Sequence, residues 1–199
     1  MRIISGTHGG RRIQPPTNMP HTRPTTDIAK EGLFNILQNQ LDFNTLTCLD
    51  LFGGTGCISY ELASRGVPDI TIVEMDSKMY DFIKKTAEEL KLENFKVIKS
   101  EVFSFINSCT NKYDFIFAGP PYALTTIDDL PTKIFENKLL KPGGRFVLEH
   151  TPRNDYRKSE YYVRERNYGT TIFSTFIFQI DFPKNNESDY LNNAITPAL

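Results

Sequence analysis

A short glycine-rich loop is the first feature of the sequence whose residues suit chemistry. The run Asp50-Leu51-Phe52-Gly53-Gly54-Thr55-Gly56 follows an apolar segment and precedes a helix-like segment. Glycines let the backbone turn sharply and approach a ligand closely, and free N–H groups at the start of the helix add hydrogen-bond donors. The run is neither Gly-x-Gly-x-x-Gly nor a Gly-Lys-Ser/Thr loop, so it lacks both phosphate-binding fingerprints.

Acidic side chains complete this candidate ligand site. Glu74 stands about 20 residues after the loop, at the end of the second apolar run, where a carboxylate can accept both hydroxyls of a ribose. Asp50 can accept an amino group, and Glu101 follows the third run, where an adenine is expected. An acid without a phosphate motif favours S-adenosylmethionine over a dinucleotide. The residues predicted to hold this cofactor are Asp50, Phe52, Gly54, Gly56, Glu74 and Glu101.

A second chemical motif is Phe117-Ala118-Gly119-Pro120-Pro121-Tyr122, at the end of the fourth apolar run. Two prolines stiffen a loop and remove two N–H donors, so its carbonyl groups project with fixed geometry. Tyr122 offers a flat face on which a nucleobase turned out of its helix can stack. We predict that the catalytic loop consists of Gly119, Pro120, Pro121 and Tyr122.

Alternating strand-like and helix-like runs must bring these loops to one edge of a sheet. Apolar runs predict strands at 46–51, 70–74, 95–98, 113–118 and 144–149, and helices are predicted at 28–37, 57–65, 76–90, 102–106 and 126–137. This alternation predicts an α/β fold with a doubly wound, mostly parallel sheet between two helical layers. Two β-rich runs, 161–166 and 170–178, predict a final antiparallel pair with its turn at Asn167-Tyr168-Gly169.

Charge and composition divide the chain into three parts. Residues 1–30 contain five basic side chains and one acidic one, a net charge of +4, whereas the whole chain carries −1. A basic segment on an acidic body favours a nucleic-acid partner. We expect an N-terminal β-hairpin and basic extension at 1–25, a catalytic domain at 26–182 and a polar, disordered tail at 183–199. The residues predicted to bind RNA are Arg11, Arg12 and Arg23.

Several classes of protein are excluded or disfavoured by composition. No apolar stretch approaches 18 residues, so no membrane-spanning helix is expected, and the N-terminal apolar run is too short for a signal peptide. The three cysteines form no C-x-x-C pair, which favours buried thiols over a disulfide framework or a zinc site. We therefore expect a cytoplasmic protein without a metal.

The motifs together resemble a known family. The glycine loop, Glu74 and Pro-Pro-Tyr resemble the amino-group methyltransferases that carry Asp/Asn-Pro-Pro-Tyr. Further segments make the chain similar to the bacterial methyltransferases that modify the N2 amine of guanine 966 in 16S rRNA; these segments are Met1-Arg2-Ile3-Ile4-Ser5-Gly6, Gly10-Arg11-Arg12, Arg23-Pro24-Thr25, Glu31-Gly32-Leu33-Phe34-Asn35-Ile36-Leu37 and Leu148-Glu149-His150. The resemblance covers about residues 1–180, and Arg-Pro-Thr is its most specific part.

The resemblance implies both a fold and an activity. The fold is a three-layer class I methyltransferase domain with a seven-stranded sheet and an N-terminal β-hairpin extension. The activity is transfer of a methyl group from S-adenosylmethionine to a guanine N2 amine in 16S rRNA. The expected substrate is the small ribosomal subunit or its assembly intermediate, and the protein is expected to act as a monomer without a metal.

One position departs from the family pattern. Gly119 stands where the family has Asp or Asn, whose side-chain oxygen holds the exocyclic amine together with the next proline carbonyl. Losing such a group lowers a rate by about 10²–10³, so Gly119→Asp is expected to raise methyl transfer by roughly 10²-fold. Water or another carboxylate, with Asp128 and Asp129 the nearest acids downstream, is the alternative source of this interaction.

Three other functions stay open at this point. The first is a non-catalytic rRNA-binding protein that keeps the cofactor fold but has lost chemistry at Gly119. The second is a DNA adenine-N6 methyltransferase, which shares Pro-Pro-Tyr, although 199 residues leave little room for a target-recognition region. A nicotinamide-dependent oxidoreductase comes last, because the pyrophosphate-binding glycine pattern is absent.

Overall fold

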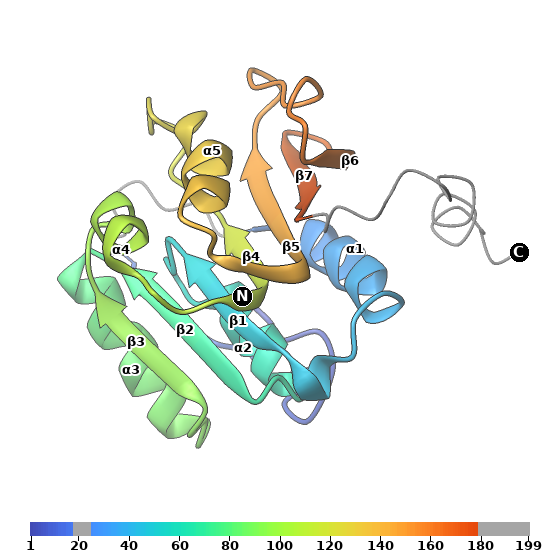
Figure 1. The fold of residues 1–199 in the computed structure, drawn as a ribbon. Helices are drawn as coiled ribbons and strands as arrows, with labels where there is room; N and C mark the ends of the chain where they lie inside the picture. Colours follow the sequence, from blue (N-terminus) through green and yellow to red (C-terminus); the bar gives the residue numbers. More distant parts are fainter. Residues whose placement is uncertain (18–24, 179–199) are drawn as a thin grey trace, which may run out of the picture.

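A seven-stranded sheet forms the centre of the protein, whose computed structural model describes residues 1–17 and 25–178 (Figure 1). The strand order is β3-β2-β1-β4-β5-β7-β6; β1 to β5 run parallel, and β7 is antiparallel to both β5 and β6. The strands are β1 (Thr47–Leu51), β2 (Asp69–Glu74), β3 (Phe95–Lys99), β4 (Tyr113–Ala118), β5 (Leu140–His150), β6 (Tyr162–Tyr168) and β7 (Thr171–Ile177). The predicted fold, a mostly parallel sheet with a final antiparallel pair, is confirmed.

Helices cover both faces of the sheet. One layer contains α1 (Asp27–Gln38), α2 (Cys57–Ser64) and α3 (Ser77–Glu89), and the other contains α4 (Val102–Ser108) and α5 (Asp129–Glu136). A short 3-10 helix, Phe43–Thr45, connects α1 to β1 and was not predicted. Among the described residues, no helix is both long and apolar enough to cross a membrane.

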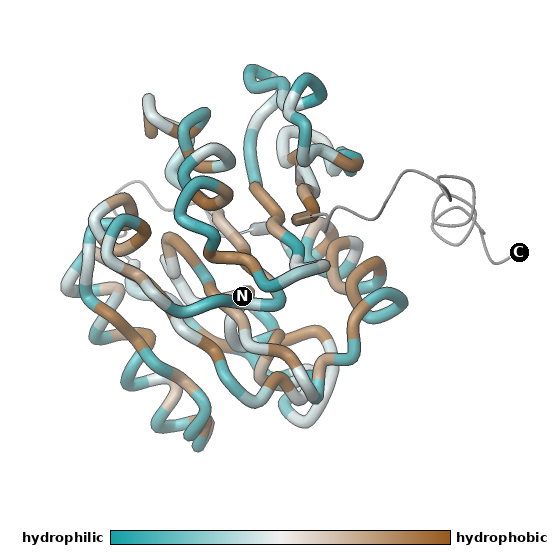
Figure 2. Tube along the Cα trace, in the orientation of Figure 1, coloured by the Kyte–Doolittle hydropathy of each residue, from teal (hydrophilic) through white to brown (hydrophobic). Residues whose placement is uncertain are grey.

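Two apolar cores form because successive strand residues point to opposite faces. On β4, Phe115 and Phe117 pack with α1 and α2, whereas Ile116 and Ala118 pack with α4 and α5. Figure 2 shows the corresponding apolar colour along the central strands, with more hydrophilic residues on the outer helices. This alternation fixes which side chains at the strand ends face α1 and α2, the side on which the candidate site lies.

Local capping explains most helix starts. Thr26 caps α1 through the N–H of Ala29, and Asp76 caps α3 through the N–H of Met79. The helix predicted at 126–137 begins later, at Asp129, because turns occupy the residues before it. The predicted final turn was also misplaced: β6 extends to Tyr168, which pairs with Thr171, and Gly169 (φ +74°) lies in the turn.

The N-terminal segment folds back on itself and packs against α2. It makes one bridge, between Arg2 and Arg12, so the predicted hairpin is present but has no extended ladder. Its Ile3 and Ile13 join a small core with Tyr60 on α2. Residues 183–199, the predicted disordered tail, lie outside the described residues.

Candidate active site at the carboxyl edge of the sheet

The glycine loop connects the end of β1 to the start of α2 in a conformation that needs glycine. Gly54 and Gly56 have φ angles of +53° and +75°, and Phe52 also lies in the left-handed region at +64°. The N–H of Gly53 donates to the carbonyl of Val73 at 2.9 Å, which holds the loop against β2. Gly56 precedes α2 without a side-chain cap, so this helix start is available to a ligand.

Glu74 holds the other side of this loop. One carboxylate oxygen accepts the N–H of Gly54 at 2.7 Å, and the other accepts the N–H of Asp76, also at 2.7 Å. Glu74 is buried, and burial raises the pKa of its carboxyl. The predicted pairing of a glycine loop with an acid at the end of β2 is therefore present as a hydrogen-bonded unit.

Asp50 lies beneath the loop, with a side chain that is only 2 % exposed. The hydroxyl of Ser59 on α2 donates to its Oδ2 at 2.5 Å. Burial raises the pKa of Asp50 to about 7, and the nearby carboxylates of Glu74 and Glu149 act in the same direction. Such a buried acid is suited to receive a cationic group, because a positive partner favours its ionised form.

Glu101 has a structural role of its own. Its two carboxylate oxygens accept the N–H groups of Phe103 and Ser104 at 2.9 and 2.8 Å, so it is the N-terminal cap of α4. The side chain is exposed after β3, and its predicted contact with an adenine stays a prediction.

The predicted catalytic loop follows β4 and adjoins the glycine loop. The N–H of Gly119 faces the carbonyl of Leu51, at the end of β1, at 3.4 Å. Pro120 is buried and Pro121 exposed, and the carbonyl of Pro121 accepts the N–H of Leu124 at 2.9 Å in a turn. Tyr122 is 43 % exposed, so its ring is accessible for stacking. The two motifs thus lie at one edge of the sheet.

Glu149, which was not predicted as a site residue, contacts this loop, and Thr25 contacts Glu149. The hydroxyl of Tyr122 donates to Glu149 Oε1 at 3.5 Å, and the hydroxyl of Thr25 donates to Glu149 Oε2 at 2.6 Å. Glu149, on β5, is only 5 % exposed. The Leu148-Glu149-His150 run was noticed only as part of the family resemblance, because nothing in its spacing indicates a neighbour 27 residues earlier.

Asp128 and Asp129, the acids considered as a replacement for the missing side chain, follow the loop and lie at the start of α5. Asp128 accepts the hydroxyl of Tyr156 at 2.8 Å and the amide of Asn154 at 3.0 Å, which ties it to the loop after β5. Asp129 is the first residue of α5 and is exposed.

The predicted RNA-binding arginines are only partly described. Arg11 and Arg12 are exposed, whereas Arg23 lies outside the described residues. The turn of the hairpin contacts Ser64 at the end of α2, far from the glycine loop at the start of that helix. Arg12 pairs with Arg2, whose Nε lies 3.7 Å from Oδ2 of Asp27 at the start of α1.

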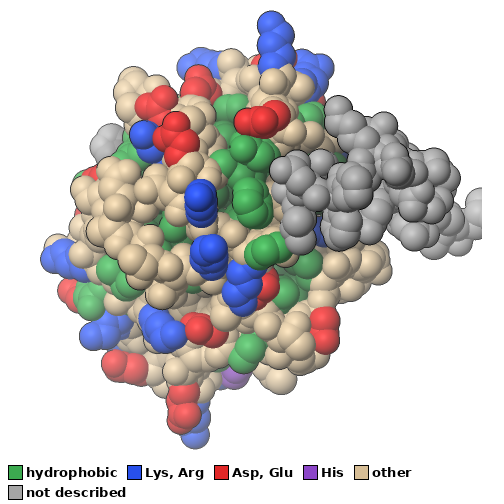
Figure 3. All heavy atoms as spheres, viewed as in Figure 1, with side chains coloured by type: hydrophobic (Ala, Val, Ile, Leu, Met, Phe, Trp, Pro, Cys, Tyr) green, Lys and Arg blue, Asp and Glu red, His purple; other side chains and the backbone are tan. Residues whose placement is uncertain are grey.

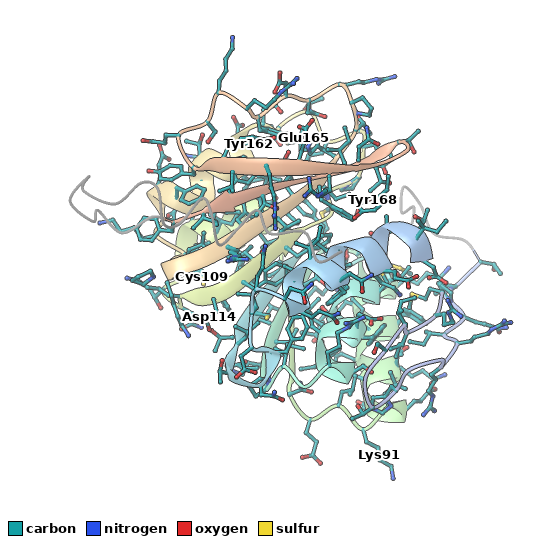
Figure 4. All side chains as sticks on the ribbon, turned by 90° about the vertical axis from the view of Figure 1, so that its right-hand side faces the viewer. Lys91, Cys109, Asp114, Tyr162, Glu165 and Tyr168 are labelled. Carbon is teal, nitrogen blue, oxygen red and sulfur yellow. The ribbon has the colours of Figure 1, made fainter. Side chains whose placement is uncertain are left out.

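A further arginine shares the sheet face of Glu149. Phe173 on β7 is directly opposite both Glu149 on β5 and Arg166 on β6. Strand spacing places the backbone of Arg166 about 10 Å from that of Glu149. Figure 4 shows Tyr168, two residues further along β6, beside α1. Basic and acidic side chains are interspersed over the face that Figure 3 shows.

The donor set fits S-adenosylmethionine better than a nucleotide phosphate. Three buried carboxylates, Asp50, Glu74 and Glu149, lie at the carboxyl edge, and the charges of Glu74 and Glu149 both raise the pKa of Asp50. Such an acidic site repels phosphate but complements a ligand that carries an ammonium, a sulfonium and ribose hydroxyls.

Comparisons with known proteins agree with this geometry. The model of the family described as conserved hypothetical protein 95 matches residues 1–177. The ribosomal RNA small subunit methyltransferase D of Haemophilus influenzae is 32 % identical over 183 residues, 90 % of this chain and 93 % of that protein. The Escherichia coli protein of the same name is 30 % identical over 154 residues, 77 % of this chain and 76 % of that protein.

A solved structure supports the same assignment. The putative methyltransferase yhhF from Escherichia coli superposes with a TM-score of 0.78 at 26 % identity, covering 90 % of this chain and 98 % of that one. The hairpin, the sheet and both site loops lie within the residues that the family model matches. The chain therefore belongs to the conserved hypothetical protein 95 family, together with the ribosomal RNA small subunit methyltransferases D.

Proposed function

We propose that this protein transfers a methyl group from S-adenosylmethionine to the N2 amine of a guanine in 16S rRNA. The observation that carries the proposal is the adjacency of the two loops: the glycine loop with Glu74 lies beside the Pro-Pro-Tyr loop, linked by Gly119 and Leu51. Family membership supports rRNA methylation, and the choice of guanine N2 rests on the sequence resemblance.

Each cofactor residue has a role that follows from its position. When bound, S-adenosylmethionine supplies a methyl group activated by a positively charged sulfur. Glu74 accepts the ribose hydroxyls while it continues to hold Gly54, and Asp50 faces the amino-acid end. The backbone of Gly54 and Gly56 permits close approach, because no side chain projects from either residue.

The catalytic loop positions the base. The exposed ring of Tyr122 provides a stacking face, and the stiff Pro120-Pro121 pair presents a carbonyl to the exocyclic amine. Holding the amine and the methyl group in line removes much of the entropic barrier, which is itself a large contribution to rate. The reaction needs neither a metal nor a covalent enzyme intermediate.

RNA contacts are proposed for Arg11, Arg12 and Arg23, within the small ribosomal subunit or its assembly intermediate. Arg166 is added because it shares the face of Glu149. We further propose that the protein acts as a monomer in the cytoplasm, where its three cysteines are free thiols; the described residues hold all three unpaired.

Methyl transfer to unmodified small subunits tests the proposal. Subunits from a strain lacking the modification are incubated with labelled cofactor, and the product is digested to nucleosides. We expect N2-methylguanosine at a single 16S position. Label in N6-methyladenosine of DNA would instead identify a DNA methyltransferase, and tight binding of cofactor and RNA without transfer would identify a non-catalytic homologue.

A further inference from the structure

We propose that Glu149 supplies the carboxylate that holds the N2 amine of the target guanine, in the place of the side chain absent at Gly119. The inference rests on the proposed function and adds the residue that completes its chemistry. Its starting point is that β4 and β5 are parallel neighbours, with Ala118 paired to Leu148. The next residue on each strand brings Gly119 beside Glu149.

The distance between the two positions is short. A Cβ placed on Gly119 would lie 3.1 Å from Cε1 of Phe117, whose ring would have to shift by a few tenths of an ångström, and 3.7 Å from Oε2 of Glu149. An aspartate side chain at this position would therefore start next to the glutamate carboxylate. Gly119 does not have a positive φ angle, so the backbone does not require glycine. Gly119, after β4, has no side chain, and the long acidic side chain of Glu149 on β5 lies next to it.

Hydrogen bonds orient this carboxylate toward the base-binding loop. Thr25 donates to Oε2 at 2.6 Å, and Tyr122, whose ring is the proposed stacking face, donates to Oε1 at 3.5 Å. The Tyr122 hydroxyl is also 3.5 Å from the hydroxyl of Thr171. A carboxylate has about four acceptor positions, so these bonds are compatible with a further N–H donor from a guanine.

The glutamate also faces the cofactor side. It contributes to the raised pKa of both Asp50 below the glycine loop and Cys57 at the start of α2, which places it within electrostatic reach of both. Glu149 therefore contacts the loop assigned to the base through Tyr122 and acts electrostatically on Asp50, beneath the loop assigned to the methyl donor.

The N2 nitrogen forms a bond to the methyl carbon while the bond from that carbon to sulfur breaks, and sulfur keeps the electron pair. The positive charge that leaves sulfur develops on nitrogen, where the Glu149 carboxylate stabilises it. One N2 proton then passes to a carboxylate oxygen and on to solvent, leaving a neutral methylamino group.

Substitution of the charge alone gives the sharpest test. Glu149→Gln keeps the side-chain shape and an acceptor for Thr25 but removes the negative charge. We expect single-turnover transfer of label from S-adenosylmethionine to small subunits to fall about 10²-fold or more, while the affinity for S-adenosylhomocysteine changes less than threefold. Glu136→Gln makes the same change at an exposed carboxylate at the end of α5 and is expected to leave transfer unchanged. Wild-type transfer by Glu149→Gln would overturn the proposal.

A rescue experiment separates chemistry from folding. Gly119→Asp in the Glu149→Gln background places a carboxylate beside the lost one, and we expect it to restore transfer at least tenfold. In the wild-type background the same change adds a like charge next to Glu149 and should give no gain, unlike the increase expected from the sequence. A tenfold gain in the wild-type background would mean that Glu149 does not already do this work, and would count against the proposal.

Binding provides a readout that does not depend on turnover. Inosine lacks only the N2 amine of guanosine, so 16S fragments with either base at the target position are compared in the presence of S-adenosylhomocysteine. We expect the wild type to prefer guanosine about tenfold and Glu149→Gln to lose that preference. If Glu149→Gln does not fold, Thr25→Val, which removes the hydroxyl that orients Glu149, should reduce the preference instead.

The readouts distinguish the two levels of inference. The identity of the methylated nucleoside tests the proposed function. The ratio of the transfer rates of wild type and Glu149→Gln tests the role of Glu149, whichever RNA amine accepts the label. If the wild type transfers nothing, the proposed function is wrong, and the comparison of guanosine with inosine still decides whether Glu149 holds the amine. No preference in the wild type would refute the role of Glu149.

Discussion

The cofactor half and the base half of the candidate site are built in different ways. In the cofactor half, the key contacts join residues that are close in sequence: Ser59 and Asp50 are nine apart, and Gly54 and Glu74 are 20 apart. In the base half, Thr25 contacts Glu149 across 124 residues, and Tyr122 contacts it across 27. The cofactor half is thus complete within one β-α-β unit, whereas the base half also uses a residue from before α1, far away in the chain.

Replacing Asp50 should give the largest effect, which is on the free energy of unfolding. Asp50 is a buried acid of the cofactor half, and its negative charge destabilises the folded protein. Burial raises its pKa from 3.8 to about 7, so the folded state holds the proton more tightly than the unfolded chain. Stability should then fall as pH rises from about 4 to about 7. We expect Asp50→Asn to be more stable than the wild type at pH 8, by up to roughly 4 kcal/mol, while cofactor affinity decreases.

Thermal or urea unfolding at several pH values measures this difference, which should vanish near pH 4. Asp114→Asn is the matched control with the opposite sign. Bonds from Lys141 and Thr47 outweigh burial and lower the pKa of Asp114, so its contribution to stability is present above the unfolded pKa and is lost as pH falls through the folded one. An Asp50→Asn protein that is less stable at pH 8 would refute the prediction.

Glu74 should show the next largest effect, on cofactor affinity. Glu74→Ala removes the acceptor for two ribose hydroxyls and also releases the N–H of Gly54. Hydrogen bonds to a charged group contribute about 1.5–3 kcal/mol, so calorimetry with S-adenosylhomocysteine should show at least a tenfold loss. Glu93→Ala removes an equal charge before β3 and serves as the control. Unchanged affinity in a folded Glu74→Ala protein would discard the assignment of the cofactor pocket.

The hairpin arginines test whether the base half extends onto the N-terminal segment. Arg11→Ala combined with Arg12→Ala should reduce the salt dependence of rRNA binding by about one to two units of slope, because each phosphate contact releases a counterion. Cofactor affinity should change little. Lys112→Ala with Lys138→Ala removes two exposed charges before β4 and β5, at the opposite edge of the sheet, and should keep the wild-type slope. A wild-type slope in the arginine variant would make the hairpin a solubilising surface.

Arg166 should give the smallest effect and locate the RNA most closely. Because Arg166 shares a strand-to-strand row with Glu149, Arg166→Ala should lower the slope by about one unit. If Arg166→Ala binds RNA normally while the hairpin variant does not, the RNA reaches the base half from the α2 side alone. Equal decreases of the slope in the Arg166 variant and the hairpin variant would indicate that the RNA crosses α1.

Much of the fold, and the cofactor half of the site, could be predicted from the sequence. Five parallel strands were readable because each is a run of apolar residues buried on both faces, and β4 (Tyr113–Ala118) has the predicted bounds. Turn positions were less accurate: the last hairpin turns at Gly169, one step beyond the predicted centre, because pairing with Thr171 extends β6 to Tyr168.

The sequence by itself determined the α/β fold, the glycine loop with Glu74 and the absence of a side chain at Gly119, because each depends on residues that are adjacent or separated by one strand–helix unit. Only the tertiary structure decided where another carboxylate lies. Strand pairing sets Glu149 beside Gly119, and α1 brings Thr25 to the same carboxylate. Gly119 and Glu149 follow consecutive strands, but only the register between β4 and β5 shows that the two residues are neighbours, and the contact of Thr25 with Glu149 spans 124 residues.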